Sequence, residues 1–210
     1  MAGMIELKAQ LGAEDASSVV SKTTSFSDQQ HLDRVKNRQM ALEVVTNNVL
    51  DEPADGILLA VDGAKRGMEG NIARQFARRY PDDWEDLQRN GVVPYPIPLG
   101  RSVAVPWDGD CPWQLILFSS TLNHRETLDD GQKRGVMRTS LSEALRLCVR
   151  YGISSLATAV LQGGWRLSAT DALQEMQAAY RGAGCPQVRL IVCQRVADLP
   201  AAAQDEDGQT

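Results

Sequence analysis

The sequence predicts an α/β protein of three layers, in which helices cover both faces of a central mixed, mostly parallel sheet of about six strands. Six short apolar or β-branched segments follow one another from residue 41 onward, and segments with helical periodicity lie between them. Uninterrupted apolar segments of this length are typical of strands buried on both faces, so we expect one buried sheet. The predicted strands are ALEVVT (41–46), GILLAVD (56–62), SVAVP (102–106), QLILFSS (114–120), SSLATAVL (154–161) and VRLIVCQ (188–194).

Two helices are predicted from apolar residues that recur at steps of three or four. The first lies in NIARQFARRY, where every fourth residue is apolar and forms one stripe. Arg74, Arg78 and Arg79 lie off this stripe, and we interpret them as a solvent-facing surface. The second is a long helix from about residue 135 to 150, and Gly152 supplies its C-terminal stop.

A third helix is predicted to begin at Ser168. Asp171 follows three positions later, which is the spacing of a capping box, and the apolar side of the segment ends near Gly182.

Composition indicates a single globular domain with extensions at both ends. The chain has 210 residues, of which 43% are hydrophobic and 23% charged, and can bury a substantial core. We expect an N-terminal extension packed on the core at 1–40, one α/β domain at 41–198 and a disordered acidic tail at 199–210. No apolar run approaches the roughly 18 residues of a membrane span and no export signal begins the chain, so we expect a cytoplasmic protein without a membrane partner.

Charge and cysteine usage exclude two classes of site. A formal net charge of −5 argues against a protein that holds nucleic acid by bulk phosphate neutralisation. The chain has four cysteines without a CxxC pair and two histidines, so zinc-ligand spacing is missing and we predict neither a metal site nor a cofactor. We expect the cysteines to be reduced and to pack as small apolar residues.

Two segments indicate a pocket for a phosphorylated ligand. ADGILLAVDGAKRGMEGNIARQF (54–76) and SSLATAVLQGGWRLSATDALQEM (154–176) each place a strand before a glycine turn that opens onto a helix. The first backbone N–H groups of a helix have no intrahelical partner, and the positive end of the helix dipole lies there, so such a loop can hold an anion. The motifs of serine hydrolases, P-loop nucleotidases and Rossmann dehydrogenases are missing from the sequence.

With the strand order, these two loops resemble a macro domain, the fold that binds ADP-ribose and related nucleotides. The resemblance covers about residues 41–198. Within the family, GNIARQF and GGWRL are most similar to the branch that contains the terminal ADP-ribose glycohydrolases and the macro-domain antitoxins that remove ADP-ribose from DNA. The resemblance implies ADP-ribose or an ADP-ribosylated macromolecule as partner, with nucleic acid a partner only as an ADP-ribosylated substrate.

The resemblance also implies the ligand-binding residues. Asn48 lies where the family usually has an aspartate that accepts from the adenine amino group, and its carbonyl oxygen can still accept. The first loop would embrace one phosphate and approach the distal ribose, and the second would surround the diphosphate. The residues implied in these loops are Gly67, Gly70, Asn71, Ile72, Gly163, Gly164, Trp165 and Arg166.

Three positions depart from the catalytic patterns of the family. Asp62 replaces the asparagine that positions water in the common hydrolase branch, and Ser120 or Thr121 replaces the lysine of the closer branch. Trp165 replaces the aspartate that accompanies this lysine. Neither a hydroxyl nor an indole can take over the chemistry of these groups at neutral pH. The sequence therefore favours binding of ADP-ribose or a related nucleoside diphosphate without efficient hydrolysis.

Two alternatives remain open at this stage. In the first, the protein hydrolyses ADP-ribosyl bonds of protein, nucleic acid or O-acetyl-ADP-ribose, with Asp62 as the candidate base. Asp62 can equally accept a hydrogen bond from ribose or satisfy N–H groups of its own loop. In the second alternative, the chain is an interaction module, such as an immunity or regulatory subunit, whose pocket is degenerate and filled by Trp165.

Overall fold

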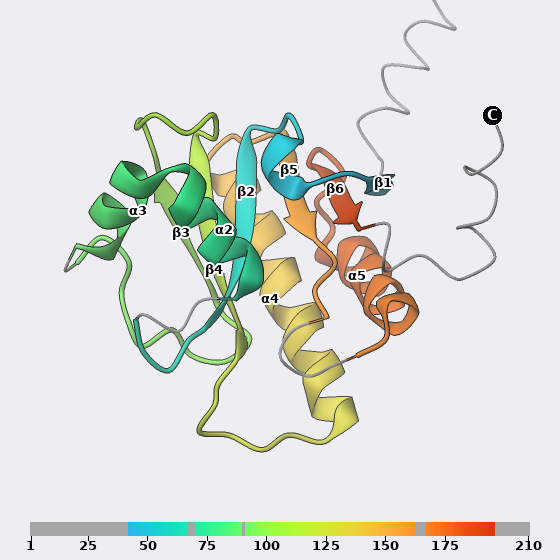
Figure 1. Cartoon of the computed structure of the whole chain (residues 1–210). Coiled ribbons are helices and arrows are strands. Elements are labelled where there is room, and N and C mark those ends of the chain that lie inside the picture. Colours follow the sequence, from blue (N-terminus) through green and yellow to red (C-terminus); the bar gives the residue numbers. More distant parts are fainter. Residues whose placement is uncertain (1–41, 67–69, 90, 163–166, 196–210) are drawn as a thin grey trace, which may run out of the picture.

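Six strands form one mixed sheet in the order β1-β6-β5-β2-β4-β3 (Figure 1). Every neighbouring pair is parallel except β3 and β4, so the predicted number of strands and the predicted mixed, mostly parallel arrangement are both confirmed. This computed structural model describes residues 42–66, 70–89, 91–162 and 167–195. The predicted N-terminal extension and acidic tail lie outside the described residues. The strands are β1 (Leu42–Thr46), β2 (Gly56–Asp62), β3 (Ser102–Pro106), β4 (Leu115–Leu122), β5 (Ser155–Ala159) and β6 (Arg189–Gln194).

Helices cover both faces of the sheet, which gives the predicted three layers (Figure 1). On one face, α4 (Asp130–Arg150) and α5 (Ala169–Ala183) pack against the strand residues that point toward them. On the other face lie α2 (Asn71–Arg79), α3 (Pro81–Gln88) and the 3₁₀ turn η1 (Val49–Asp51). Successive residues of a strand point to opposite faces, so each central strand contributes to both apolar cores.

The four central strands are buried along almost their whole length, but the two edge strands are not. No residue of β1 is buried, and Val44 is 44% exposed. In β3 only the first and fourth residues are buried. The expectation that all six strands are buried on both faces is therefore wrong for the edges, because the helices cover these strands only in part.

Local capping determines where the long helices begin and end. In α4, Asp129 Oδ1 accepts from Gln132 N at 2.8 Å and Gln132 Oε1 accepts from Asp129 N at 2.9 Å, a reciprocal capping box. This box starts the helix at Asp130, five residues before the predicted start. Gly152 ends it with a φ of 71°, as predicted.

Of the remaining helices, α5 was predicted and α3 was not. The Ser168 side chain accepts from Asp171 N at 3.0 Å, so the predicted helix start is confirmed. Its end lies at Gly184, which has a φ of 66°, beyond the predicted Gly182. The short helix α3 was not predicted, and it begins with a proline at its first position. No helix within the described ranges is long and apolar enough to cross a bilayer.

One buried carboxylate holds the connection between β3 and β4. Asp83, on α3, is 6% exposed and accepts from Trp107 Nε1 at 2.9 Å, Asp110 N at 3.0 Å and Cys111 N at 2.8 Å. Hydrogen bonds to a charged acceptor are stronger than neutral ones, and three donors lose their partner if this acceptor is removed. Asp83 therefore stabilises the loop between β3 and β4, although it lies far from this loop in the sequence.

We predict that Asp83→Ala lowers the free energy of unfolding by about 2 to 4 kcal/mol, measured by urea denaturation. Asp82→Ala is the matched control, since Asp82 lies in the same first turn of α3 but is exposed. It removes the same charge near the helix start and costs less than about 1 kcal/mol. Equal effects of the two variants would contradict the role of Asp83.

Candidate functional site

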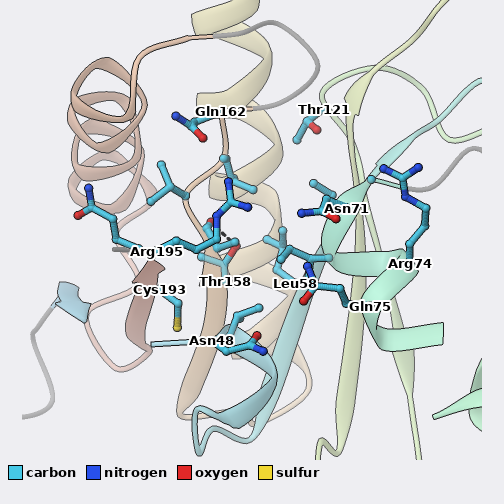
Figure 2. A pocket seen from close by; sticks show the side chains of 18 of the residues that line it. Asn48, Leu58, Asn71, Arg74, Gln75, Thr121, Thr158, Gln162, Cys193 and Arg195 are labelled. Atoms are coloured by element: carbon cyan, nitrogen blue, oxygen red, sulfur yellow. Dashed lines mark hydrogen bonds between the residues drawn. The ribbon is translucent and has the colours of Figure 1, made fainter. Parts of the chain in front are cut away.

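A cavity of about 700 Å³ lies at the carboxyl ends of the five parallel strands (Figure 2). Each of these strands contributes a residue from its end or near it, and helix α2 and the segment after β5 complete the lining. Ligand sites in open α/β sheets are typically found at this edge, at the point where the connections of two neighbouring strands lead to opposite sides of the sheet. The strand residues at the cavity are Thr46, Asp62, Thr121, Ala159 and Gln194.

The cavity exists because β2 and β5 separate before their carboxyl ends. Their ladder contains only three pairs, from Gly56 opposite Leu156 to Leu58 opposite Thr158. Beyond these pairs β2 continues beside β4, while β5 continues beside β6. Leu58 and Thr158, the last pair, line the cavity. The space between the diverging strand ends is thus built into the strand order.

Helix α2 opens onto this space with its first N–H groups uncapped. Its N-cap residue is Gly70, which has no side chain to accept from the amides of the first turn, and this turn contains no acidic residue. The other α-helices of the described segments each have an acidic residue in the first turn. The first turn of α2 therefore presents the positive end of a helix dipole that nothing within the described residues neutralises.

Glycine is required at position 70 by close packing. A Cβ at Gly70 would lie 2.6 Å from the backbone oxygen of Ala60 on β2. The start of α2 thus lies directly against the end of β2, closer than any other residue type allows. Gly70, Asn71 and Ile72 all line the cavity as a result.

The arginines of α2 separate into three environments. Arg74 is exposed and lines the cavity, with no ion pair among the described residues. Arg79 forms an ion pair with Asp51, and Arg78 is exposed away from the cavity. The interpretation of all three as one solvent-facing surface is thus incomplete, because Arg74 also faces the site. Arg195, after β6, adds a second cationic side chain to the lining (Figure 2).

The Asp62 side chain is 3% exposed and holds two loops together. Its Oδ1 accepts from Ala64 N at 2.9 Å, in the loop that leads toward α2. Its Oδ2 accepts from His124 N at 3.0 Å and lies 2.9 Å from His124 Nδ1, in the connection between β4 and α4. Both carboxylate oxygens are therefore engaged by protein groups.

The end of the cavity away from Thr121 and Gln162 is formed by Asn48 and apolar groups (Figure 2). Asn48 Oδ1 accepts from Leu50 N at 3.1 Å and caps the 3₁₀ turn, so that buried Val49 lies against the cavity. Cys193 lies beside them (Figure 2). Burial raises the pKa of the Cys193 thiol to about 12, so the thiol stays protonated at neutral pH and is a poor nucleophile.

The structure brings half of the predicted site residues into one cavity. Asn48, Asp62, Gly70, Asn71 and Ile72 all line it, although they come from three separate parts of the chain. The other predicted residues, Gly67, Gly163, Gly164, Trp165 and Arg166, lie outside the described residues.

The two hydroxyl candidates for the position of the family's lysine differ in location. Both residues are buried, but only Thr121 lines the cavity, and the Oγ of Ser120 has no hydrogen-bond partner among the described residues. Within the same ranges, no cluster of three or more histidine, cysteine, aspartate or glutamate side chains could hold a metal ion.

Sequence analysis missed three residues at or beside the site, namely Gln162, Arg195 and His124. Gln162 and Arg195 line the cavity, and each follows a predicted strand directly, a position that marks the ligand edge of a parallel sheet. His124 contacts Asp62 from 62 residues away, and no local pattern indicates that contact.

A scan against protein-family models and a search of curated proteins each find no match. Solved structures do match. The macrodomain of Mycobacterium tuberculosis DarG aligns with 73% of this chain and 97% of its own, with 20% identity and a TM-score of 0.56. The macrodomain of Thermus aquaticus DarG gives the same coverage and identity with a TM-score of 0.55. The Oceanobacillus iheyensis macrodomain with ADP aligns with 74% of this chain and 84% of its own, at 14% identity and a TM-score of 0.57. The chain therefore has the macrodomain fold.

Proposed function

We propose that the cavity binds ADP-ribose or a related nucleoside diphosphate, free or attached to a macromolecule, without efficient hydrolysis. The uncapped first turn of α2 carries this proposal. Its amides lie at the gap between β2 and β5, where backbone N–H groups and the helix dipole together favour a phosphate.

The charges around the cavity favour an anionic ligand. Arg74 and Arg195 line it, and Asp62 is the one carboxylate among the described lining residues. Because both oxygens of Asp62 accept from N–H groups, its charge is already compensated within the protein. The net charge of the whole chain is −5, whereas the described residues that line the cavity include two arginines and one carboxylate.

The size and shape of the cavity also fit a nucleotide. A volume of about 700 Å³ lies within the usual range for small-molecule sites. Apolar groups at the Asn48 end suit a flat base, while the polar end near Asn71 and Thr121 suits phosphate and ribose (Figure 2). One structure with the same fold contains ADP, and this supports the assignment of the ligand class.

The absence of efficient hydrolysis rests on the groups around the cavity. Asp62 is occupied by loop N–H groups, which makes it a poor candidate for a base that must accept a proton from water. Thr121 has a hydroxyl, which cannot form the imine that a lysine would form with an opened sugar.

Hydrolysis of ADP-ribosyl bonds remains a second candidate function because of one contact. His124 Nδ1 lies 2.9 Å from Asp62 Oδ2, and the histidine side chain is 37% exposed. A carboxylate that orients a histidine in this way is a recurring arrangement for a general base. An interaction module with a degenerate pocket is favoured less, because the described residues enclose an open space of nucleotide size.

Calorimetric titration with ADP-ribose, ADP and NAD tests the binding proposal. We expect saturable binding below millimolar concentration, and we expect Arg74→Ala to weaken it by about threefold to tenfold through loss of a charge-assisted contact. Arg78→Ala is the matched control on the same helix and leaves the affinity unchanged. The proposal fails if no ligand binds at millimolar concentration, and the location of the site is wrong if both variants weaken binding equally.

A second prediction separates the structural role of Asp62 from a catalytic one. Asp62→Ala removes the acceptor of three contacts and lowers the free energy of unfolding by about 2 to 3 kcal/mol in urea denaturation. Asp108→Ala, at an exposed position, changes it by less than about 0.5 kcal/mol. If Asp62→Ala keeps wild-type stability while a measurable hydrolysis of ADP-ribosylated substrate disappears, the catalytic alternative is the better one.

A further inference from the structure

The connection that leads from β2 toward α2 is attached to the segment at 93–97. Ile97 N donates to Gly63 O at 2.9 Å. Three residues further along the connection, Arg66 Nη2 donates to Val93 O at 3.0 Å. The described part of the connection is therefore bound to one and the same segment at its beginning and at its end.

A ring contact strengthens the attachment at Arg66. The Cζ atom of Arg66 lies over the Tyr95 ring, 5.6 Å from its centre, which is the distance of a cation–π contact. Val93 and Ile97, on either side of this tyrosine, are buried in the apolar core that α2 covers. The guanidinium of Arg66 thus holds the connection to a segment that is itself anchored in the core.

The two adjacent basic residues of this connection differ in their surroundings. Lys65 is exposed, whereas the Arg66 side chain is partly buried and engaged by the protein. Arg66 is also not among the described residues that line the cavity. Any effect of Arg66 on the site therefore passes through the chain that it holds.

The start of α2 depends on such an anchor because no side chain caps it. Its N-cap residue is Gly70, and its first hydrogen bond runs from Arg74 N to Gly70 O at 3.1 Å. In other helices an N-cap side chain restrains the first turn, and contacts of the preceding chain fix the angle of entry. Arg66 lies four residues before Gly70, and four residues span at most about 14 Å. The fixed position of Arg66 therefore limits where the chain can enter α2.

Resting on the proposed function, we infer that Arg66 is a positioning residue of the anion site. By tethering the connection to the 93–97 segment, it restrains the first turn of α2 and keeps the unpaired amides of that turn in place for a phosphate. A site that is ordered before binding leaves less conformational entropy for the ligand to remove, so the affinity rises. Arg66 contributes geometry to the site, and not its charge.

Amide hydrogen exchange of the ligand-free protein tests the restraint. Arg66→Ala removes both contacts of the guanidinium. We expect the Arg74 amide, which makes the first hydrogen bond of α2, to exchange about threefold or more faster, while the Tyr80 amide at the other end of the helix keeps its wild-type rate. Lys65→Ala removes the neighbouring exposed cation and changes neither rate. Arg66→Met keeps an unbranched side chain without charge or donors, and it replaces Arg66→Ala if that variant does not fold.

Calorimetric titration with ADP tests the consequence for binding. We expect Arg66→Ala to weaken the affinity by about threefold to tenfold at a temperature where the variant is folded, and Lys65→Ala to leave it unchanged. Salt separates positioning from charge, because about 0.5 M NaCl screens exposed charges. The ratio of wild-type to Arg66→Ala affinity stays the same in this salt, whereas the corresponding ratio for Arg74→Ala falls toward one.

The outcomes separate this inference from the proposed function. If the wild-type protein binds no nucleotide at millimolar concentration, the proposed function fails, and the inference fails with it. If the wild type binds ADP but Arg66→Ala keeps either the Arg74 exchange rate or the affinity of the wild type, the inference alone is overturned. It is also overturned if all amides of α2 exchange faster to the same degree, which indicates a general loss of stability, or if the effect on affinity disappears in high salt, which indicates a role of the charge.

Discussion

The separation of β2 from β5 is the constraint on which the candidate site depends. These strands share only three pairs, and their carboxyl ends diverge toward β4 and β6. The divergence leaves a space at an edge where five parallel strands end, and α2 begins over it with unpaired amides. A helix start of this kind needs a negatively charged partner or solvent, and the protein supplies no acidic residue in that turn. The cavity and the anion preference that we propose for it therefore have one common origin.

The loops of this sheet are positioned by side chains that act as hydrogen-bond acceptors for backbone groups. At the cavity, Asp62 holds the loops after β2 and β4, and Asn48 caps the turn after β1. At the other end of the sheet, Asp83 holds the loop between β3 and β4. Each of these polar groups has a structural role, so residue identity alone is a poor guide to function here. Asp62 resembles a catalytic base in sequence, but its oxygens already have protein partners.

The fold was predictable from sequence because its determinants are local. Strand segments, the Ser168 cap and the Gly152 stop depend on residues within a few positions of one another, and all are confirmed. The candidate site residues were predicted only through the resemblance in fold, and half of the predicted residues lie outside the described ranges, where the prediction stays untested. The contact of Asp62 with His124 and the location of Arg74 at the cavity depend on how distant segments pack. The use of the Asn48 oxygen by Leu50 is a matter of side-chain orientation, which residue spacing does not determine.

The central claim is that the first turn of α2 holds a phosphate at the gap between β2 and β5. A crystal structure of the protein with a bound nucleoside diphosphate tests it most directly. The account predicts phosphate oxygens within about 3 Å of the backbone nitrogens of Asn71 or Ile72, with the base toward Asn48. A nucleotide bound elsewhere, or bound here with its phosphates away from α2, would contradict it.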